Sequence, residues 1–425
     1  MKTHSQSTAE TMKTESMKTH RIYSMFLPCQ SGKTRQMIRA IQRNYDESEK
    51  RPIPIVLSTN HSQLTIQTAM RLHKSLGSIY KIFVLNSMNP YRTTHLFKKD
   101  TIVYNPPTNA MTAYIDRFVD PMYPNILPPI ILALSNNNQV EKVCSLIETI
   151  DSDYDYPFDM YFDEADVTYS QYRTEWNSYM YRANNMILIT ATPQKLMEFD
   201  EIKESVQPYP VEYDKAFYDL YLNHLDNDAV IYHANPDPMA TFDANMFIYK
   251  TIQRNYHHFA DKLDDGSYRR ILAVTSHRVV DHEELAAMII EDYGFNVLTV
   301  NGEGVILHRS EKNKKVYPVK KEFSEVLASI NGEADVKDKP LVIVGNRRID
   351  RGVTFQNPSK EFLVRDIIIS PGIKSNNIPR MVQVLGRIAG YIKGALINKD
   401  DKINIFLTES QEEPVKARDA DSTSE

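Results

Sequence analysis

The clearest chemical signal in the sequence is a Gly-Lys-Thr triplet between a strand-like run and a helix-like one. The apolar residues 22–26 lead into the letters LPCQSGKT at 27–34, and a helical pattern follows. Backbone N–H groups at a helix N-terminus attract anions, and a glycine lets the backbone approach a phosphate. The pattern predicts a phosphate-binding loop, with a lysine for the phosphate oxygens and a threonine hydroxyl for Mg²⁺. Its candidate residues are Gln30, Ser31, Gly32, Lys33 and Thr34.

A second signal is an acidic box at residues 159–166. The letters DMYFDEAD at 159–166 form an apolar stub that ends in the adjacent carboxylates Asp163 and Glu164. At the carboxyl end of a parallel strand, such a pair faces the same crevice as a phosphate-binding loop. Asp163 is predicted to ligate Mg²⁺ and Glu164 to polarise an attacking water.

Strand-like and helix-like stretches alternate through the chain and must position these groups. The strand-like runs are rich in Val, Ile and Leu with little polar alternation, which is typical of strands covered on both faces in a parallel sheet. The class predicted is therefore α/β. Strands are expected at 53–57, 82–85, 130–134, 160–162, 186–189, 270–274, 297–300, 340–344, 367–370 and 402–407, and helices at 34–43, 63–75, 139–148 and 280–292.

Composition excludes several classes of protein. The chain has 425 residues, of which 42% are hydrophobic and 25% charged, an ordinary globular mixture. Its two cysteines exclude a disulfide scaffold and a multi-cysteine zinc site. We expect no structural metal, no membrane segment and an intracellular location. The net charge of −5 neither indicates nor excludes binding of nucleic acid.

The same patterns divide the chain. Residues 1–19 are polar and repetitive, and we expect a disordered tail. Residues 20–205 and 246–410 are the two expected α/β domains, joined across 206–245, where the pattern weakens. Residues 411–425 are expected to form a loose acidic tail.

Further short motifs follow the strand-like runs. They are 56–60 (VLSTN), 133–137 (ALSNN), 189–193 (ITATP), 271–276 (ILAVTS), 345–355 (GNRRIDRGVTF) and 383–390 (QVLGRIAG). With the phosphate loop and the acidic box, their types and order make the chain resemble the superfamily 2 helicases and translocases, in a divergent DEAD/DEAH-like form of viral or phage type. The resemblance covers about residues 22–395.

The resemblance implies two tandem RecA-like domains with mainly parallel sheets and ATP in the cleft between them. The chain would be an ATP hydrolase that uses ATP and Mg²⁺ to move along or unwind DNA or RNA. Glu164 would be the general base, Arg387 would reach the γ-phosphate from the second domain with Gln383 beside it, and Arg351 would contact the nucleotide. Asp166, Thr190 and Thr192 would couple the nucleotide state to domain closure.

Contacts to a nucleic-acid backbone need hydroxyl, amide and cationic groups. The motif positions that offer them are Ser58, Thr59 and Asn60 in the first domain and Thr275, Ser276 and Arg278 in the second. A basic stretch at 308–321 is interpreted either as an insertion that holds a nucleic-acid strand or as a solvated loop. Four tyrosines at 169–181 could stack on bases, although packing around the helix after the acidic box is the favoured interpretation.

Two departures from the family pattern keep other functions open. Leu27 stands where the phosphate loop usually has Gly or Ala, and Gly390 stands where the last motif usually has a second arginine. An ATP-gated nucleic-acid clamp or scaffold with weak hydrolysis is therefore an alternative. Another is the motor subunit of a restriction or packaging machine. No specificity domain is evident, so a protein partner could supply targeting.

Overall fold

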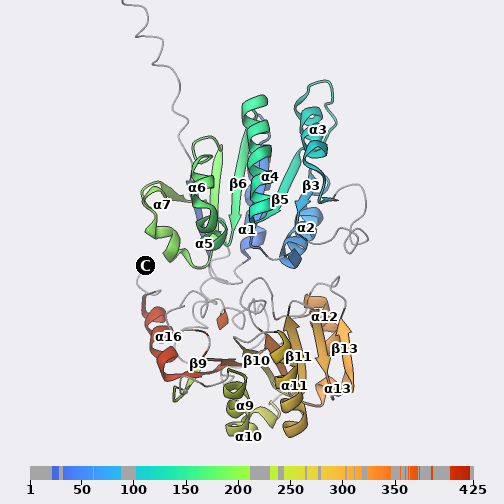
Figure 1. The fold of residues 1–425 in the computed structure, drawn as a ribbon, viewed down its shortest axis with the longest axis vertical. Helices are drawn as coiled ribbons and strands as arrows, with labels where there is room; N and C mark the ends of the chain where they lie inside the picture. Colours follow the sequence, from blue (N-terminus) through green and yellow to red (C-terminus); the bar gives the residue numbers. More distant parts are fainter. Residues whose placement is uncertain are drawn as a thin grey trace, which may run out of the picture. The chain divides into compact units, whose positions relative to one another are not determined.

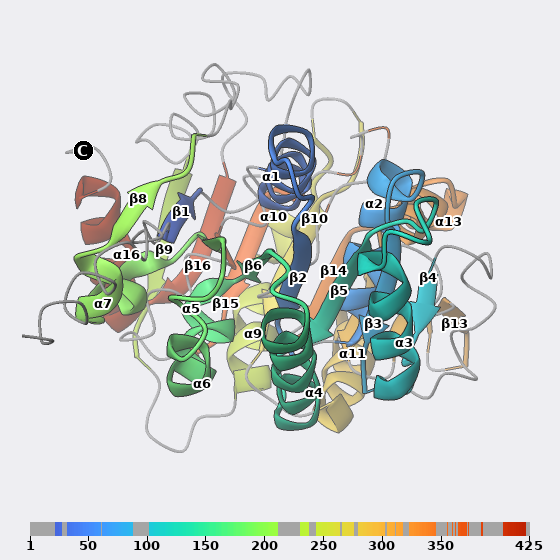
Figure 2. The ribbon, with the colours of Figure 1, turned by 90° about the horizontal axis from the view of Figure 1, so that it is seen from above.

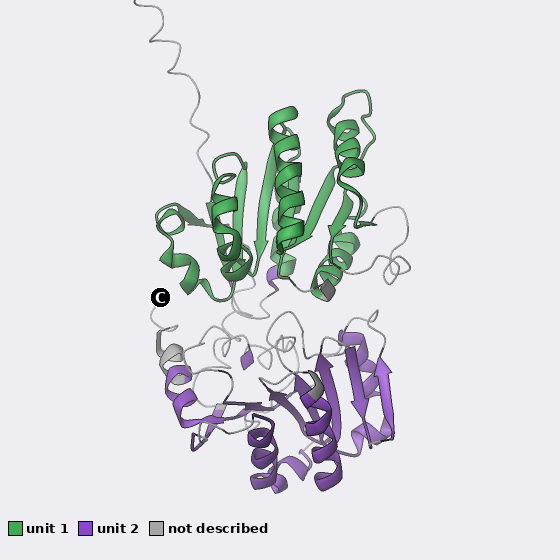
Figure 3. Cartoon of the chain, viewed as in Figure 1, with its two compact units in different colours: residues 1–26, 34–210 green, residues 27–33, 211–425 purple. Residues whose placement is uncertain are grey.

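The computed structural model separates the chain into two compact units (Figure 3). Unit 1 comprises residues 1–26 and 34–210, and unit 2 comprises residues 27–33 and 211–425. The expected tail at 1–19 lies outside the described residues. Those are 22–27, 32–60, 62–87, 102–210, 230–237, 244–263, 266–275, 279–301, 304–310, 312–317, 323–345, 355, 359, 362, 364–371, 373, 384–385 and 403–421.

Unit 1 contains a sheet in which all neighbouring strands pair in parallel, in the order β4-β3-β5-β2-β6-β7-β1-β8. Figure 1 labels β6, β5 and β3 of this sheet. Every residue of β2, β5 and β7 is buried, as expected for strands covered on both faces. The strands are β1 Ile22–Phe26, β2 Ile53–Ser58, β3 Lys81–Leu85, β4 Ile102–Tyr104, β5 Pro129–Leu134, β6 Phe158–Asp163, β7 Asn185–Thr190 and β8 Val206–Pro208.

Helices cover both faces of this sheet. Figure 2 shows α1 and α2 on one face and α3 and α4 on the other. In α1, Met37, Ala40 and Ile41 are buried, at the spacing that places side chains on one side of a helix. The helices are α1 Lys33–Glu47, α2 Ser62–Leu76, α3 Thr108–Val119, α4 Asn137–Glu148, α5 Ala165–Thr168, α6 Arg173–Asn177 and α7 Asp200–Lys203, with a π-helical turn at Thr149–Asp153 and 3₁₀ turns at Ser170–Tyr172 and Pro193–Glu198.

Unit 2 contains a second sheet, in the order β13-β12-β11-β14-β10-β15-β16-β9. Its described neighbours are parallel except at one end, where β12 and β13 form an antiparallel hairpin beside β11. The strands are β9 Val230–Asn235, β10 Arg270–Val274, β11 Asn296–Asn301, β12 Gly304–His308, β13 Lys314–Tyr317, β14 Leu341–Gly345, β15 Asp366–Ile369 and β16 Ile403–Thr408.

Alternate residues of the unit 2 strands enter two separate cores. Leu272 and Val274 of β10 belong to a core that also contains apolar residues of α12, α13 and α16. Ile271 and Ala273 belong to a core with residues of α9, α10 and α11. This alternation follows from the two-residue repeat of a strand. The helices are α9 Ala244–Arg254, α10 Tyr256–Ala260, α11 Val279–Tyr293, α12 Phe323–Asn331, α13 Ala334–Lys337 and α16 Glu409–Asp421.

The predicted α/β class with mainly parallel sheets is confirmed. The expected loose tail at 411–425 is wrong over its described part, because α16 extends to Asp421 and buries Gln411 and Val415. The Gln411 amide donates to the carbonyl oxygens of Ser370 and Ile373, at 3.0 and 2.7 Å. The expected junction at 206–245 includes β8 and β9, which pair with β1 and β16. The other domain boundaries stay predictions.

No described helix has the length and apolar character required to cross a bilayer.

Candidate active site

The start of α1 has the character of an anion-binding helix end. Gly32, directly before it, has φ +86°, a left-handed conformation that a glycine adopts without strain. Lys33 and Thr34 open a helix of 15 residues whose first turn has no acidic residue. The partial positive charge of that end therefore stays available for a phosphate. The predicted Gln30 and Ser31 lie outside the described residues.

The acidic box is a sharp turn at the end of β6. The strand is buried up to Phe162, whereas Asp163 and Glu164 are partly exposed. Glu164 has φ 54° and ψ 57° and precedes α5. A left-handed conformation is uncommon for a residue other than glycine, and such strain persists where the surrounding structure enforces it. The Thr168 hydroxyl is part of that structure, because it donates to the carbonyl oxygens of Asp163 and Glu164, at 3.1 and 3.3 Å.

The strands that carry the predicted groups are neighbours and end together. Strand β7 lies between β1 and β6. In the β1–β7 pair Phe26 is opposite Thr190, and in the β6–β7 pair Asp163 is opposite Ile189. Because all three strands are parallel, the phosphate-loop strand, Thr190 and the acidic box end at the same edge of the sheet.

The three predicted coupling residues form one buried hydrogen-bonded group. The Thr190 hydroxyl donates to a carboxylate oxygen of Asp166 at 2.8 Å. The same oxygen of Thr190 accepts the N–H of Thr192 at 3.1 Å. Their exposed fractions are 0% for Thr190, 2% for Thr192 and 6% for Asp166. The structure thus joins the segment after the acidic box to the end of β7.

Three of the predicted nucleic-acid contacts have buried side chains. The Ser58 hydroxyl is within 2.7 Å of the Thr65 hydroxyl, and Thr59 is 8% exposed. In unit 2 the Thr275 hydroxyl donates to the Asn245 side-chain oxygen at 3.0 Å. The hydroxyls of Ser58 and Thr275 thus satisfy polar groups of the fold, and contact of these three residues with nucleic acid stays a prediction. Ser276 and Arg278 lie outside the described residues.

Asn60, the remaining predicted contact, is exposed and belongs to a small cluster of polar side chains. The Asn136 amide donates to the Asn60 side-chain oxygen at 3.2 Å and to the Ser87 hydroxyl at 3.0 Å. Asn136 also caps α4, since its side-chain oxygen accepts the Gln139 N–H. Loops after β2, β3 and β5 thus converge at one edge. Ser87 was missed because it stands outside any recognised motif.

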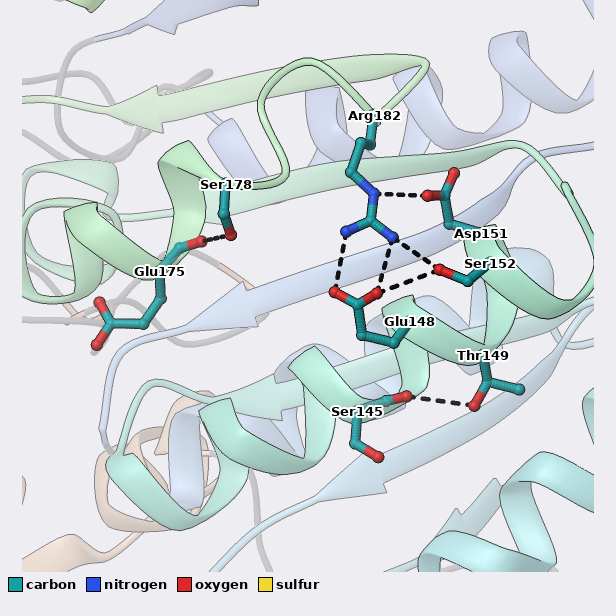
Figure 4. A network of polar contacts seen from close by, with 8 residues as sticks. All are labelled: Ser145, Glu148, Thr149, Asp151, Ser152, Glu175, Ser178 and Arg182. Atoms are coloured by element: carbon teal, nitrogen blue, oxygen red, sulfur yellow. Dashed lines mark hydrogen bonds and ion pairs between the residues drawn. The ribbon is translucent and has the colours of Figure 1, made fainter.

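Arginine networks fasten the segments that flank the acidic box. Figure 4 shows the Arg182 guanidinium between Glu148 and Asp151, with N–O distances of 2.9 and 2.5 Å, so that the connection into β7 is tied to the one into β6. The hydrogen bonds of Arg182 lower the pKa of Glu148. A second pair joins Arg173 of α6 to Glu201 of α7 and lowers the pKa of Glu201 to about 2.

The aromatic residues after the acidic box mostly pack inside unit 1. Tyr169, Tyr172 and Tyr179 are no more than 7% exposed, whereas Tyr181 is 61% exposed. Tyr169 and Trp176 both contact the ring of Phe162 edge to face. This agrees with packing as the favoured interpretation for three of the four tyrosines.

The described part of the basic stretch lies in the β12–β13 hairpin, and acids pair with three of its cations. Lys314 binds Glu283 at 3.0 Å, Lys315 binds Glu333 at 2.5 Å, and Arg309 binds Glu333 and Asp335. This pairing favours the solvated interpretation over a strand-holding one for the described part. Burial and Lys314 lower the pKa of His308, at the end of β12, to about 4.

The arginines expected in the second domain, Arg351 and Arg387, lie outside the described residues, as does Gln383. Among the residues that the structure describes, no three His, Cys, Asp or Glu side chains group as metal ligands.

Comparisons with known proteins concern the fold. No family model matches the sequence, and a search of curated proteins finds no match. Among solved structures, the Escherichia coli DEAH/RHA helicase HrpB has a TM-score of 0.51 and 10% identity, over 93% of this chain and 41% of HrpB. The S. cerevisiae protein Dbp5 bound to RNA and ADP BeF3 has a TM-score of 0.48 and 11% identity, over 95% and 83%. A DEAD box protein from Methanococcus jannaschii has a TM-score of 0.42 and 12% identity, over 96% and 87%.

The chain therefore has the tandem RecA-like fold of two mainly parallel sheets that the sequence predicted, and this fold is similar to that of HrpB. This rests on the two sheets and on the likeness to HrpB, of which the chain spans less than half.

Proposed function

We propose that this protein is a nucleic-acid-dependent ATPase that acts as a helicase or translocase on DNA or RNA. The observation that carries the proposal is the shared sheet edge of unit 1. There the ends of β1, β7 and β6 lie in register, with Phe26 opposite Thr190 and Asp163 opposite Ile189. A helix N-terminus with a lysine, a threonine hydroxyl and two partly exposed carboxylates is the set of groups that phosphoryl transfer to water requires.

Each group has a distinct role in this proposal. Lys33 and the N–H groups at the start of α1 bind the β- and γ-phosphates. The hydroxyl of Thr34 and the carboxylate of Asp163 are hard oxygen ligands that fit Mg²⁺, which would neutralise phosphate charge when bound. Glu164 orients the attacking water and takes its proton. Thr190 and Asp166 hold the acidic box and the end of β7 together as the nucleotide changes. Arg387, Gln383 and Arg351 keep their predicted roles at the γ-phosphate and the nucleotide.

Release of phosphate from ATP, with and without single- and double-stranded RNA and DNA, tests the proposal. We expect stimulation by at least one nucleic acid. Lys33→Ala and Glu164→Gln should each abolish hydrolysis, while Glu164→Gln still binds ATP. Arg387→Ala should reduce hydrolysis far more than ATP binding. An arginine that reaches the γ-phosphate from the second domain acts mainly in the transition state. Wild-type turnover in the Lys33 or Glu164 variant would overturn the site.

An ATP-gated clamp is the second candidate. The buried Leu27 favours it, because a large apolar side chain replaces the small residue that the motif usually has there. The absence of a second arginine at Gly390 points the same way. A clamp would bind nucleic acid tightly with ATP and show no stimulated phosphate release, so the same assay separates the two functions.

A further inference from the structure

A buried residue after the acidic box connects two parts of unit 1 that the motifs treat separately. The carbonyl oxygen of Thr168, in α5, accepts the Ser135 hydroxyl at 3.4 Å and the indole N–H of Trp176 at 3.1 Å. Ser135 belongs to the loop after β5. All three residues are 0% exposed. We call Ser135, Thr168 and Trp176 the Thr168 junction.

The junction reaches the acidic box through the other polar groups of Thr168. Its hydroxyl donates to the carbonyl oxygens of Asp163 and Glu164, and its N–H donates to the Glu164 carbonyl at 3.0 Å. Trp176 also packs edge to face on Phe162, the residue before Asp163, with ring centroids 5.6 Å apart. The junction therefore holds the peptide groups of both carboxylate residues.

On its other side, the junction leads to the polar cluster of Asn60, Ser87 and Asn136. Asn136 follows Ser135 directly, and its neighbour Asn137 accepts the Tyr172 hydroxyl at 2.8 Å. Tyr172 stands between Thr168 and Trp176 in the sequence. Two separate hydrogen bonds thus tie the segment after the acidic box to the loop that bears the cluster.

Buried hydrogen bonds of this kind resist independent movement of the groups they join. If the loop after β5 shifted and the segment after the acidic box did not, the Ser135 hydroxyl would lose its acceptor in a site that water does not reach. An unsatisfied buried polar group is costly, so the two segments are expected to move together.

We propose that the Thr168 junction transmits nucleic-acid binding at the Asn136 cluster to the acidic box, and so sets the coupling between nucleic acid and ATP. Ser135 and Trp176 are positioning residues in this device, which is separate from the contact between Thr190 and Asp166. The inference rests on the proposed function. Coupling is reciprocal: the factor by which nucleic acid tightens nucleotide binding is also the factor by which nucleotide tightens nucleic-acid binding.

The test measures that factor in the full chain. The affinity for a short fluorescein-labelled single-stranded oligonucleotide, as RNA and as DNA, is measured by anisotropy with and without a non-hydrolysable ATP analogue and Mg²⁺. Ser135→Ala should leave the affinity without nucleotide unchanged and reduce the coupling factor roughly threefold to tenfold, the effect of one hydrogen bond. Trp176→Phe, which keeps an aromatic ring beside Phe162 and loses the N–H, should act in the same direction.

Ser178→Ala is the matched control. It removes a hydroxyl that donates to the Glu175 carbonyl at 2.6 Å (Figure 4), two residues after Trp176 in the sequence. The control variant should keep the coupling factor of the wild-type protein. A wild-type factor in both Ser135→Ala and Trp176→Phe would overturn the junction and leave the proposed function intact. A wild-type protein without any coupling would overturn the proposed function and the junction with it.

Discussion

Each unit buries one carboxylate near the amino end of an inner strand, and the two are held by different chemistry. Asp159, the second residue of β6, accepts the side-chain amides of Asn44 and Asn185, at 2.9 and 2.8 Å. Asp366, the first residue of β15, lies 2.8 Å from the His258 ring nitrogen and 3.3 Å from the Arg269 guanidinium. Both carboxylates are 0% exposed.

The difference shows how a buried charge can be compensated. Unit 2 places an arginine beside Asp366, so that the carboxylate has a counter-charge. Unit 1 offers Asp159 neutral amides and the Tyr161 hydroxyl. Burial raises the pKa of Asp159 to about 6, although the amide hydrogen bonds lower it in part. Asp159 can therefore be accommodated with or without its proton, whereas Asp366 belongs to an ion pair.

The largest expected effect is a loss of stability in unit 2 when its buried carboxylate is removed. Asp366→Ala should destabilise unit 2 by about 3–5 kcal/mol, because Arg269 and the Asn404 amide lose a buried partner. Hydrogen exchange of peptides that cover β15 and β16 measures the loss. Trp176 is the single tryptophan and is buried in unit 1, so its fluorescence reports the unfolding of that unit. The unfolding transition that it follows should be the same as in the wild type.

Asp335→Ala is the control for that variant. Asp335 is also paired with an arginine of unit 2, but its side chain is 56% exposed, so its loss should cost less than about 1 kcal/mol. Equal effects of the two substitutions would contradict the role assigned to burial.

The next effect concerns pH and belongs to unit 1. The folded-state pKa of Asp159, about 6, exceeds the ordinary value of 3.8. Between these values the folded state holds a proton that the unfolded state releases. The contribution to stability is therefore full below about pH 4 and is lost as the pH rises through 6, by up to about 3 kcal/mol. Urea unfolding followed by Trp176 fluorescence should show this slope in the wild type.

Asp159→Asn removes the titrating group and should flatten that slope. The difference between the two proteins isolates Asp159 from the other carboxylates of the chain. An identical slope in both would show that Asp159 does not hold a proton in the folded state.

The smallest expected effect on stability concerns the neutral groups around Asp159, which we call the neutral cage: the amides of Asn44 and Asn185 and the Tyr161 hydroxyl. The Tyr161 hydroxyl lies 3.5 Å from Asp159 and accepts the Asn44 amide at 3.0 Å. Tyr161→Phe should cost about 1 kcal/mol, the contribution of a typical hydrogen bond, in the same urea assay. Tyr154→Phe, which removes a half-buried hydroxyl bonded to Asp116, should cost less. A larger loss in the control would show that burial does not rank these two bonds.

The sequence predicted the sheets because continuous apolar runs mark strands that are covered on both faces. It did not predict the β12–β13 hairpin, since exposed Lys314 and Lys315 hide the strand pattern. It also did not predict α16, because this helix has few apolar residues and is attached largely by Gln411.

Within the site, motif order predicted the group formed by Asp166, Thr190 and Thr192. Accessibility was not predictable in the same way, as the buried Ser58 and Thr275 show. A hydroxyl at a strand end can face solvent or satisfy the fold, and its residue type does not decide which. Asp159 and Asp366 were missed for a related reason: their partners are distant in sequence, so no local pattern reveals the cage or the ion pair.

The bond between Asn44 and Asp159 has a consequence for the opposite end of α1. Asn44 lies in the last turns of this helix, and Asp159 lies on the strand that ends at Asp163. The C-terminal end of the helix is thus attached to the N-terminal end of the strand. This hydrogen bond fixes the C-terminal part of α1 against the start of β6. Replacement of Asn44 would therefore loosen this attachment without changing any residue of the phosphate-binding loop.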